Sequence, residues 1–129
     1  MPTPPELEGD FRSPAERAAA RAELRRLGHF LRDVIAAARG AAVTPPWLTA
    51  ELGKPLRGHV ESPDERLARY YTVFGDELLA LEDALSVEED NHLDDESLRA
   101  ARYLARRLLA TLLDCPAGEV SQHLPAGSA

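Results

Sequence analysis

The residues best suited to chemistry lie in an acidic stretch from Glu88 to Glu96, which contains one Glu-x-x-His motif. Carboxylate-bridged dimetal bundles place this spacing, here Glu89 to His92, on each of two helices and add two more inward carboxylates. The sequence has no second copy of the motif, and its other histidines are scattered. The stretch also lacks the alternating acidic residues and central glycine of a calcium-binding EF-hand loop. We therefore expect no metal and no cofactor.

Nucleophilic catalysis has little support in the sequence. Cys115 is the single cysteine and follows the predicted C-terminal turn of a helix, where the helix dipole disfavours a thiolate. The chain contains neither a Gly-x-Ser-x-Gly motif nor a glycine-rich phosphate loop. One cysteine cannot form an intrachain disulfide, which is typical of a protein of the reducing cytoplasm.

The charge of the chain is unevenly distributed. The net charge is −7, but residues 61–98 carry thirteen acidic and two basic side chains, while residues 1–60 and 99–129 each have a net charge of +2. A protein that binds a phosphate backbone needs concentrated Lys and Arg, so we expect no nucleic-acid partner. An acidic surface would instead attract a basic protein.

The sequence shows no membrane or secretion signal. Its first residues lack the basic and apolar regions of a signal peptide, and no apolar run approaches the roughly 20 residues that a membrane-spanning helix needs. We therefore expect a soluble cytoplasmic protein with no membrane partner. The frequent Ala, Arg, Leu and Pro resemble the usage of high-GC bacterial coding sequences.

Composition and length predict an all-α protein. The 129 residues are rich in Leu and Ala, which suit helices, whereas aromatic residues make up only 5% and Ile occurs once. We predict a three-long-helix bundle over about 14–39, 63–87 and 95–114, with a short extra helix near 45–52 and flexible termini.

The chain divides into three parts by composition. Residues 1–10 are Pro-rich and polar, which predicts a disordered leader. Residues 11–115 form a single helical-bundle domain. Residues 116–129 follow the helix-ending Cys115-Pro116 and are predicted to form a flexible tail with at most one short helical turn.

Capping signals place the helix ends. Ser13 and Ser62 each begin a Ser-Pro-x-Glu sequence, which combines an N-cap, a proline at the first helical position and a capping-box glutamate. Asp94 or Asp95 is the predicted N-cap of the third long helix. Prolines and glycines break the chain between the first two long helices, where Trp47 is expected to cover one end of the core.

Each long helix carries an apolar stripe with spacings of three and four residues, as in helices that pack against partner helices. Gly75 interrupts the second stripe, and we predict that it marks a close crossing by another helix. The third helix has an unusually wide apolar face that includes Leu104 and Leu108. This face either is buried on both flanks of a central helix or offers a surface for self-association or a partner.

Arg25, Arg32 and Arg39 recur at seven-residue spacing on one side of the first helix. They are predicted, with the arginines at positions 99, 102 and 106 of the third helix, to flank the acidic second helix inside the bundle. Such ion pairs add little stability each, but they help to select an antiparallel arrangement.

These features favour a non-catalytic protein that acts through protein–protein contacts, of a regulatory, adaptor or immunity type. The predicted partner-binding residues lie on the second helix, the acidic loop after it and the third helix. They are Asp83, Glu88, Glu89, Asp90, Leu104 and Leu108. The alternative is a small helical enzyme, or enzyme subunit, with a polar site between helices formed by Glu77, Glu82, His92 and Asp95.

Overall fold

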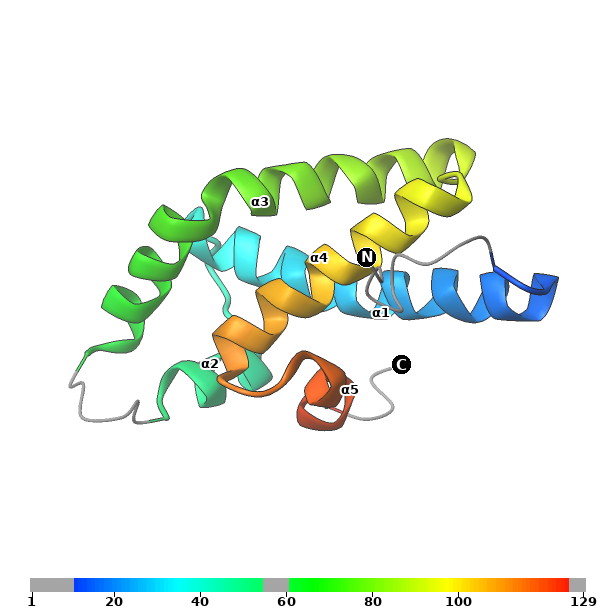
Figure 1. Ribbon diagram of the computed structural model, residues 1–129. Coiled ribbons are helices and arrows are strands. Elements are labelled where there is room, and N and C mark those ends of the chain that lie inside the picture. The colour runs from blue at the N-terminus through cyan, green and yellow to red at the C-terminus, as the bar shows by residue number, and fades with distance from the viewer. Residues whose placement is uncertain (1–10, 55–60, 126–129) are drawn as a thin grey trace.

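The fold is an all-α bundle of three long helices, as predicted. The computed structural model describes residues 11–54 and 61–125, and within these ranges every regular element is helical. In chain order the elements are α1 (Pro14–Ala38), α2 (Pro46–Leu52), α3 (Pro63–Asn91), α4 (Asp95–Leu113), the 3₁₀ turn η2 (Ala117–Glu119) and α5 (Val120–His123). Each long helix packs against the other two, and Figure 1 shows α4 crossing α1 obliquely while α3 runs along the top.

The predicted capping signals begin the three long helices. Ser13 Oγ accepts the backbone N–H of Glu16 at 3.1 Å, and Asp94 caps α4 in the same way. Ser62 forms a complete capping box, since its Oγ accepts the N–H of Glu65 and Glu65 Oε1 accepts the N–H of Ser62. These bonds satisfy donors that the first turn leaves unpaired, and each typically stabilises a helix by about 1 kcal/mol.

The close crossing between helices lies at Gly28, not at Gly75. A Cβ atom added at Gly28 of α1 would lie 2.6 Å from Cδ2 of Leu85 on α3, whereas one added at Gly75 would meet nothing within 4 Å. The prediction for Gly75 was therefore wrong. The missing side chain at Gly28 lets α3 approach α1 closely enough for Leu85 to fill the space.

Trp47 covers one end of the core, as predicted. Its ring packs edge-on against Phe30 with centroids 5.1 Å apart, and its indole N–H donates to Asp33 at 2.9 Å. The buried Arg66 joins three helices at this end. It donates from α3 to the carbonyl oxygens of Glu51 in α2 and Leu112 in α4, each at 2.6 Å.

The packed part of the chain extends beyond the expected boundary at residue 115. The short helical turn predicted in the tail is present as α5. Val120 and Leu124 are 1% and 4% exposed, so this segment contributes to the core instead of being flexible throughout. Its sequence holds only two large apolar residues, too few to show a helical period. The predicted leader at residues 1–10 and the final four residues lie outside the described part of the chain.

α3 continues to Asn91 instead of ending near residue 87. The middle of the acidic stretch, predicted to be the loop that joins the second and third long helices, is therefore helical as far as Asn91. Arginines of α1 neutralise two carboxylates of this stretch, Glu88 and Glu89. His92 then turns the chain toward α4 with a positive φ of 49°.

The same substitution at the two helical glycines tests the crossing. Gly28→Val should lower the free energy of unfolding by about 1–3 kcal/mol, because the added atoms overpack Leu85. Gly75→Val should change it by less than about 0.5 kcal/mol, because the space is open and valine has the better helix propensity. Urea unfolding followed by circular dichroism measures both, and equal losses at the two positions would contradict the crossing at Gly28.

Candidate functional site

α3 presents two different faces. Its inner face supplies Leu78, Leu81 and Leu85 to the core, and none of these is more than 4% exposed. Its outer face carries a second set of residues, spaced alternately by three and four positions, and all of them are exposed. We call this set the outer seam; it consists of Val73, Asp76, Ala80, Asp83, Val87 and Asp90.

Exposed aliphatic side chains concentrate on this helix. Val73, Leu79 and Val87 are 59%, 44% and 50% exposed, and Val43 is the one other large hydrophobic residue that is exposed in the described part of the chain. Leu79 lies beside the outer seam, one position before Ala80. Exposed apolar residues on one helix face, rather than scattered singly, are a feature of binding surfaces.

Carboxylates on the inner flank of α3 are bound by α1. Arg39 donates to both carboxylate oxygens of Glu82 at 3.3 Å, and Arg32 pairs with Glu89. Since arginines earlier in α1 pair with carboxylates later in α3, the two helices are antiparallel. This confirms the predicted role of Arg32 and Arg39, whereas Arg25 is exposed and forms no ion pair within the described ranges.

Glu88 lies at the corner where α3 turns into α4. Its side chain is 9% exposed, pairs with Arg21 of α1, and accepts the backbone N–H of Leu93 at 2.9 Å. Arg21 also donates to the carbonyl oxygen of Leu93 at 3.0 Å, and Nδ1 of His92 lies 2.9 Å from Oε2 of Glu88. Every polar atom of the Glu88 carboxylate is therefore used to fix the corner.

The acidic residues of the outer seam have no such partners. Asp76, Asp83 and Asp90 form no ion pair with any residue in the ranges 11–54 and 61–125. The sequence between Arg69 and Arg99 contains neither lysine nor arginine. The outer seam is therefore a strip of uncompensated negative charge interleaved with valine and alanine side chains.

The predicted partner-binding residues separate into three groups. Asp83 and Asp90 lie on the outer seam, and Glu89 is exposed on the inner flank of α3 with Arg32 as partner. Glu88 and Leu108 are buried, so neither can contact a partner directly, and Leu104 is half-buried. The wide apolar face of α4 is explained by packing, because α1, α3 and the C-terminal segment all cover it.

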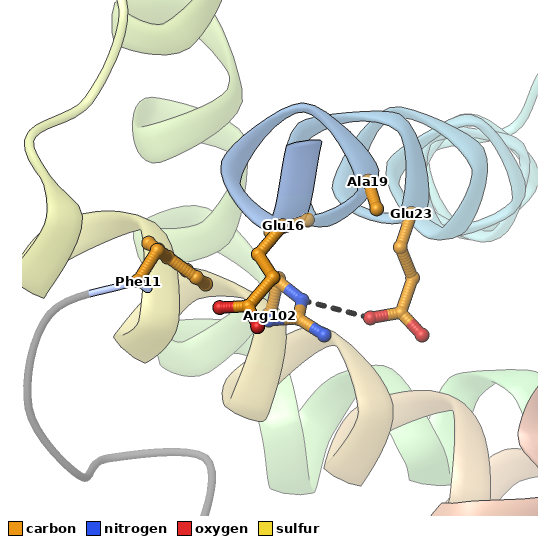
Figure 2. A pocket seen from close by; sticks show the side chains of 6 residues that line it. Phe11, Glu16, Ala19, Glu23 and Arg102 are labelled. Carbon is orange, nitrogen blue, oxygen red and sulfur yellow. Dashed lines mark hydrogen bonds and ion pairs between the residues drawn. The ribbon is translucent and has the colours of Figure 1, made fainter. Parts of the chain in front are cut away.

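A cavity of about 410 Å³ opens between α1 and α4. Figure 2 shows Arg102 of α4 reaching toward the carboxylate of Glu23 on α1. Arg102 and Arg106 donate to Glu23 at 2.8 and 2.6 Å. These arginines therefore pair with α1, and the prediction that they flank α3 was wrong. The lining residues are Phe11, Glu16, Ala19, Ala20, Glu23 and Arg102.

The charged groups around this cavity satisfy one another. Burial alone would raise the pKa of Glu23, but hydrogen bonds from Arg106 and Arg102 lower it more, so its pKa lies below the ordinary value of 4.5. Glu16 accepts the backbone N–H of Arg12 at 2.7 Å. The cavity wall is therefore an ion-paired contact between α1 and α4.

Comparison with known proteins gives no match. No protein-family model, no curated protein and no solved structure is detectably similar to this chain.

The four polar residues of the enzymatic alternative do not converge. Glu82 is held by Arg39 and Asp95 by Arg17, and His92 is at the α3–α4 corner. Glu77 lines a small pocket between α3 and α4. Within the described ranges, no three His, Cys, Asp or Glu side chains come together to hold a metal ion. No helix there is both long and apolar enough to cross a membrane.

Cys115 is a free, half-buried thiol just after α4. Burial raises its pKa above the ordinary value of 9.0, and the carboxylates of Glu119, Glu51 and Asp114 add to this effect. A thiol with a raised pKa holds little thiolate near neutral pH and is a poor nucleophile.

The Glu23 ion pairs predict a specific acid sensitivity. A carboxylate whose pKa is lowered by folding stabilises the fold above its unfolded pKa, and this contribution is lost as the pH falls through the lower, folded value. Wild-type stability should therefore fall as the pH drops below about 4.5, and Glu23→Gln should remove part of that fall while lowering stability at pH 7. Urea unfolding at several pH values gives the free energy of unfolding of the wild type, of Glu23→Gln and of the control Glu119→Gln. If the free energy of Glu23→Gln depends on pH in parallel with that of the wild type, the prediction is contradicted.

Proposed function

We propose that this protein is a non-catalytic helical module that acts by binding another protein through the outward face of α3. One observation carries the proposal: the outer seam combines exposed aliphatic side chains with three aspartates that the bundle itself leaves unpaired. A surface whose only role is solvation gains nothing from Val73 and Val87 at about half exposure. A binding surface gains from both kinds of residue, since apolar contacts supply affinity and charges speed encounter.

Rigidity of the presenting helix also supports binding. α3 is 29 residues long, and its last turn is tied to α1 through Glu88 while its first turns are tied to α2 and α4 through Arg66. A helix that is held at both ends loses little conformational freedom when a partner docks, which favours affinity.

The proposed setting is the cytoplasm, with a protein rather than a nucleic acid as partner. The free thiol of Cys115 suits a reducing compartment. The unpaired carboxylates of the outer seam would repel phosphate groups. An adaptor, regulatory or immunity-type protein would meet these conditions.

Site-specific photocrosslinking in the native cell tests the proposal. A photoreactive amino acid at Leu79, beside the outer seam, should give a crosslinked product of discrete mass that contains a second protein. The same amino acid at Ala22, which is exposed on α1, is the matched control and should give no such product. Reversing the charge of Asp83 and Asp90 to lysine should abolish the product from position 79.

Two results would contradict the proposed function. One is the absence of any product from position 79 in cells that express the protein at its natural level. The other is a product that forms equally from position 22 and survives the charge reversal, since it would report chance encounters.

A further inference from the structure

The outer seam has the repeat of a coiled-coil contact. Its spacings of three and four residues place Val73, Ala80 and Val87 at one set of heptad positions and Asp76, Asp83 and Asp90 at the other. Because an α-helix rises about 1.5 Å per residue, successive aspartates lie about 10.5 Å apart and the seam is about 25 Å long. A surface of this shape fits one helix lying along α3.

We propose that the occupant of this seam is a cationic amphipathic helix of another protein, an inference that rests on the proposed function. Its contact face would alternate apolar residues, opposite Val73, Ala80 and Val87, with arginine or lysine opposite the aspartates. Each aspartate would then gain the counter-charge that α1 gives to Glu82, Glu88 and Glu89 on the other side of the same helix.

Charge decides against a second copy of this chain as the occupant. Parallel packing of two α3 helices would place aspartate against aspartate, and antiparallel packing would press each aspartate onto an apolar residue. α3 has no lysine or arginine after Arg69 that could offset either arrangement. Like charges at facing positions disfavour self-association and so leave the seam free for a basic partner.

Arginine suits the partner better than lysine. Its guanidinium donates two parallel hydrogen bonds to one carboxylate and is more weakly hydrated than an ammonium group. α1 already binds α3 in this manner, since Arg39 donates to both oxygens of Glu82. The small side chains at positions 73, 80 and 87 keep the partner helix close enough for the same geometry on the outer side.

Two synthetic helical peptides of identical composition, each about 20 residues long to match the seam, test the inference. The seam peptide alternates leucine and arginine on one face at spacings of three and four. The segregated peptide places the leucines on one face and the arginines on the opposite face. Fluorescence anisotropy with the full chain should show that the seam peptide binds at least about tenfold more tightly.

Matched variants locate the binding. A triple variant should bind the seam peptide about tenfold more weakly, and its binding should depend less on salt, because three exposed charge pairs are lost. This variant combines Asp76→Asn, Asp83→Asn and Asp90→Asn. The control removes three exposed carboxylates outside the seam by Asp64→Asn, Glu96→Gln and Glu119→Gln. It has the same net charge and should bind within about twofold of wild type.

Three outcomes would overturn the inference. The two peptides could bind equally, which would show attraction to net charge alone, or neither could bind. Alternatively, sedimentation could show that the chain forms a dimer that Ala80→Arg disrupts, which would make a second copy the occupant. If photocrosslinking from position 79 still yields a different protein, any of these results would reject only the cationic helix as the occupant. The proposed function would then remain supported.

Discussion

The ion pair between Arg21 and Glu88 is the contact on which the arrangement of the long helices depends. Their side chains are 18% and 9% exposed, and a charge so far removed from water is costly without its partner. Arg21 comes from α1, Glu88 from the last turn of α3, and both also bind the backbone of Leu93 in the turn to α4. One pair of side chains thus fixes the end of α3 relative to both neighbours.

Once this corner is fixed, the charges of α3 divide between two sides. The inner-flank carboxylates Glu82, Glu88 and Glu89 are matched to α1 arginines, and the leucines beside them are buried. None of the ion pairs that arginines of α1 and α4 form within the described ranges reaches the outer seam, which therefore keeps its negative charge. The unpaired aspartates of the outer seam therefore concentrate negative charge on one face of α3, which is the condition for selective binding of a basic partner.

Local signals in the sequence predict the elements well, because caps and apolar periods act over a few residues. Ser62 and Asp94, for example, cap their helices through hydrogen bonds to residues only three positions later in the chain. Contacts between distant segments are not predictable in this way. Gly28 and Gly75 both lie within long helices, and only the packed structure shows that Leu85 of α3 lies against Gly28.

The candidate surface shows the same limit. Its acidic character could be predicted from composition, and the exposure of Asp83 and Asp90 from their positions outside the apolar stripe. That Glu88 is buried could not, because its partner Arg21 is 67 residues away in the chain. The outer seam was present in the sequence, but a stripe that alternates valine or alanine with aspartate resembles an ordinary solvated face until the inner face is known.

A double-mutant cycle on Arg21 and Glu88 measures whether this pair orients α3. Arg21→Met, Glu88→Gln and the double variant are unfolded in urea beside the wild type, and the coupling free energy is taken from the four values. We predict a coupling of about 1–3 kcal/mol, as expected for a largely buried charge pair in one network. A coupling below about 0.3 kcal/mol would show that the two residues act independently and would contradict the claim that this pair orients α3.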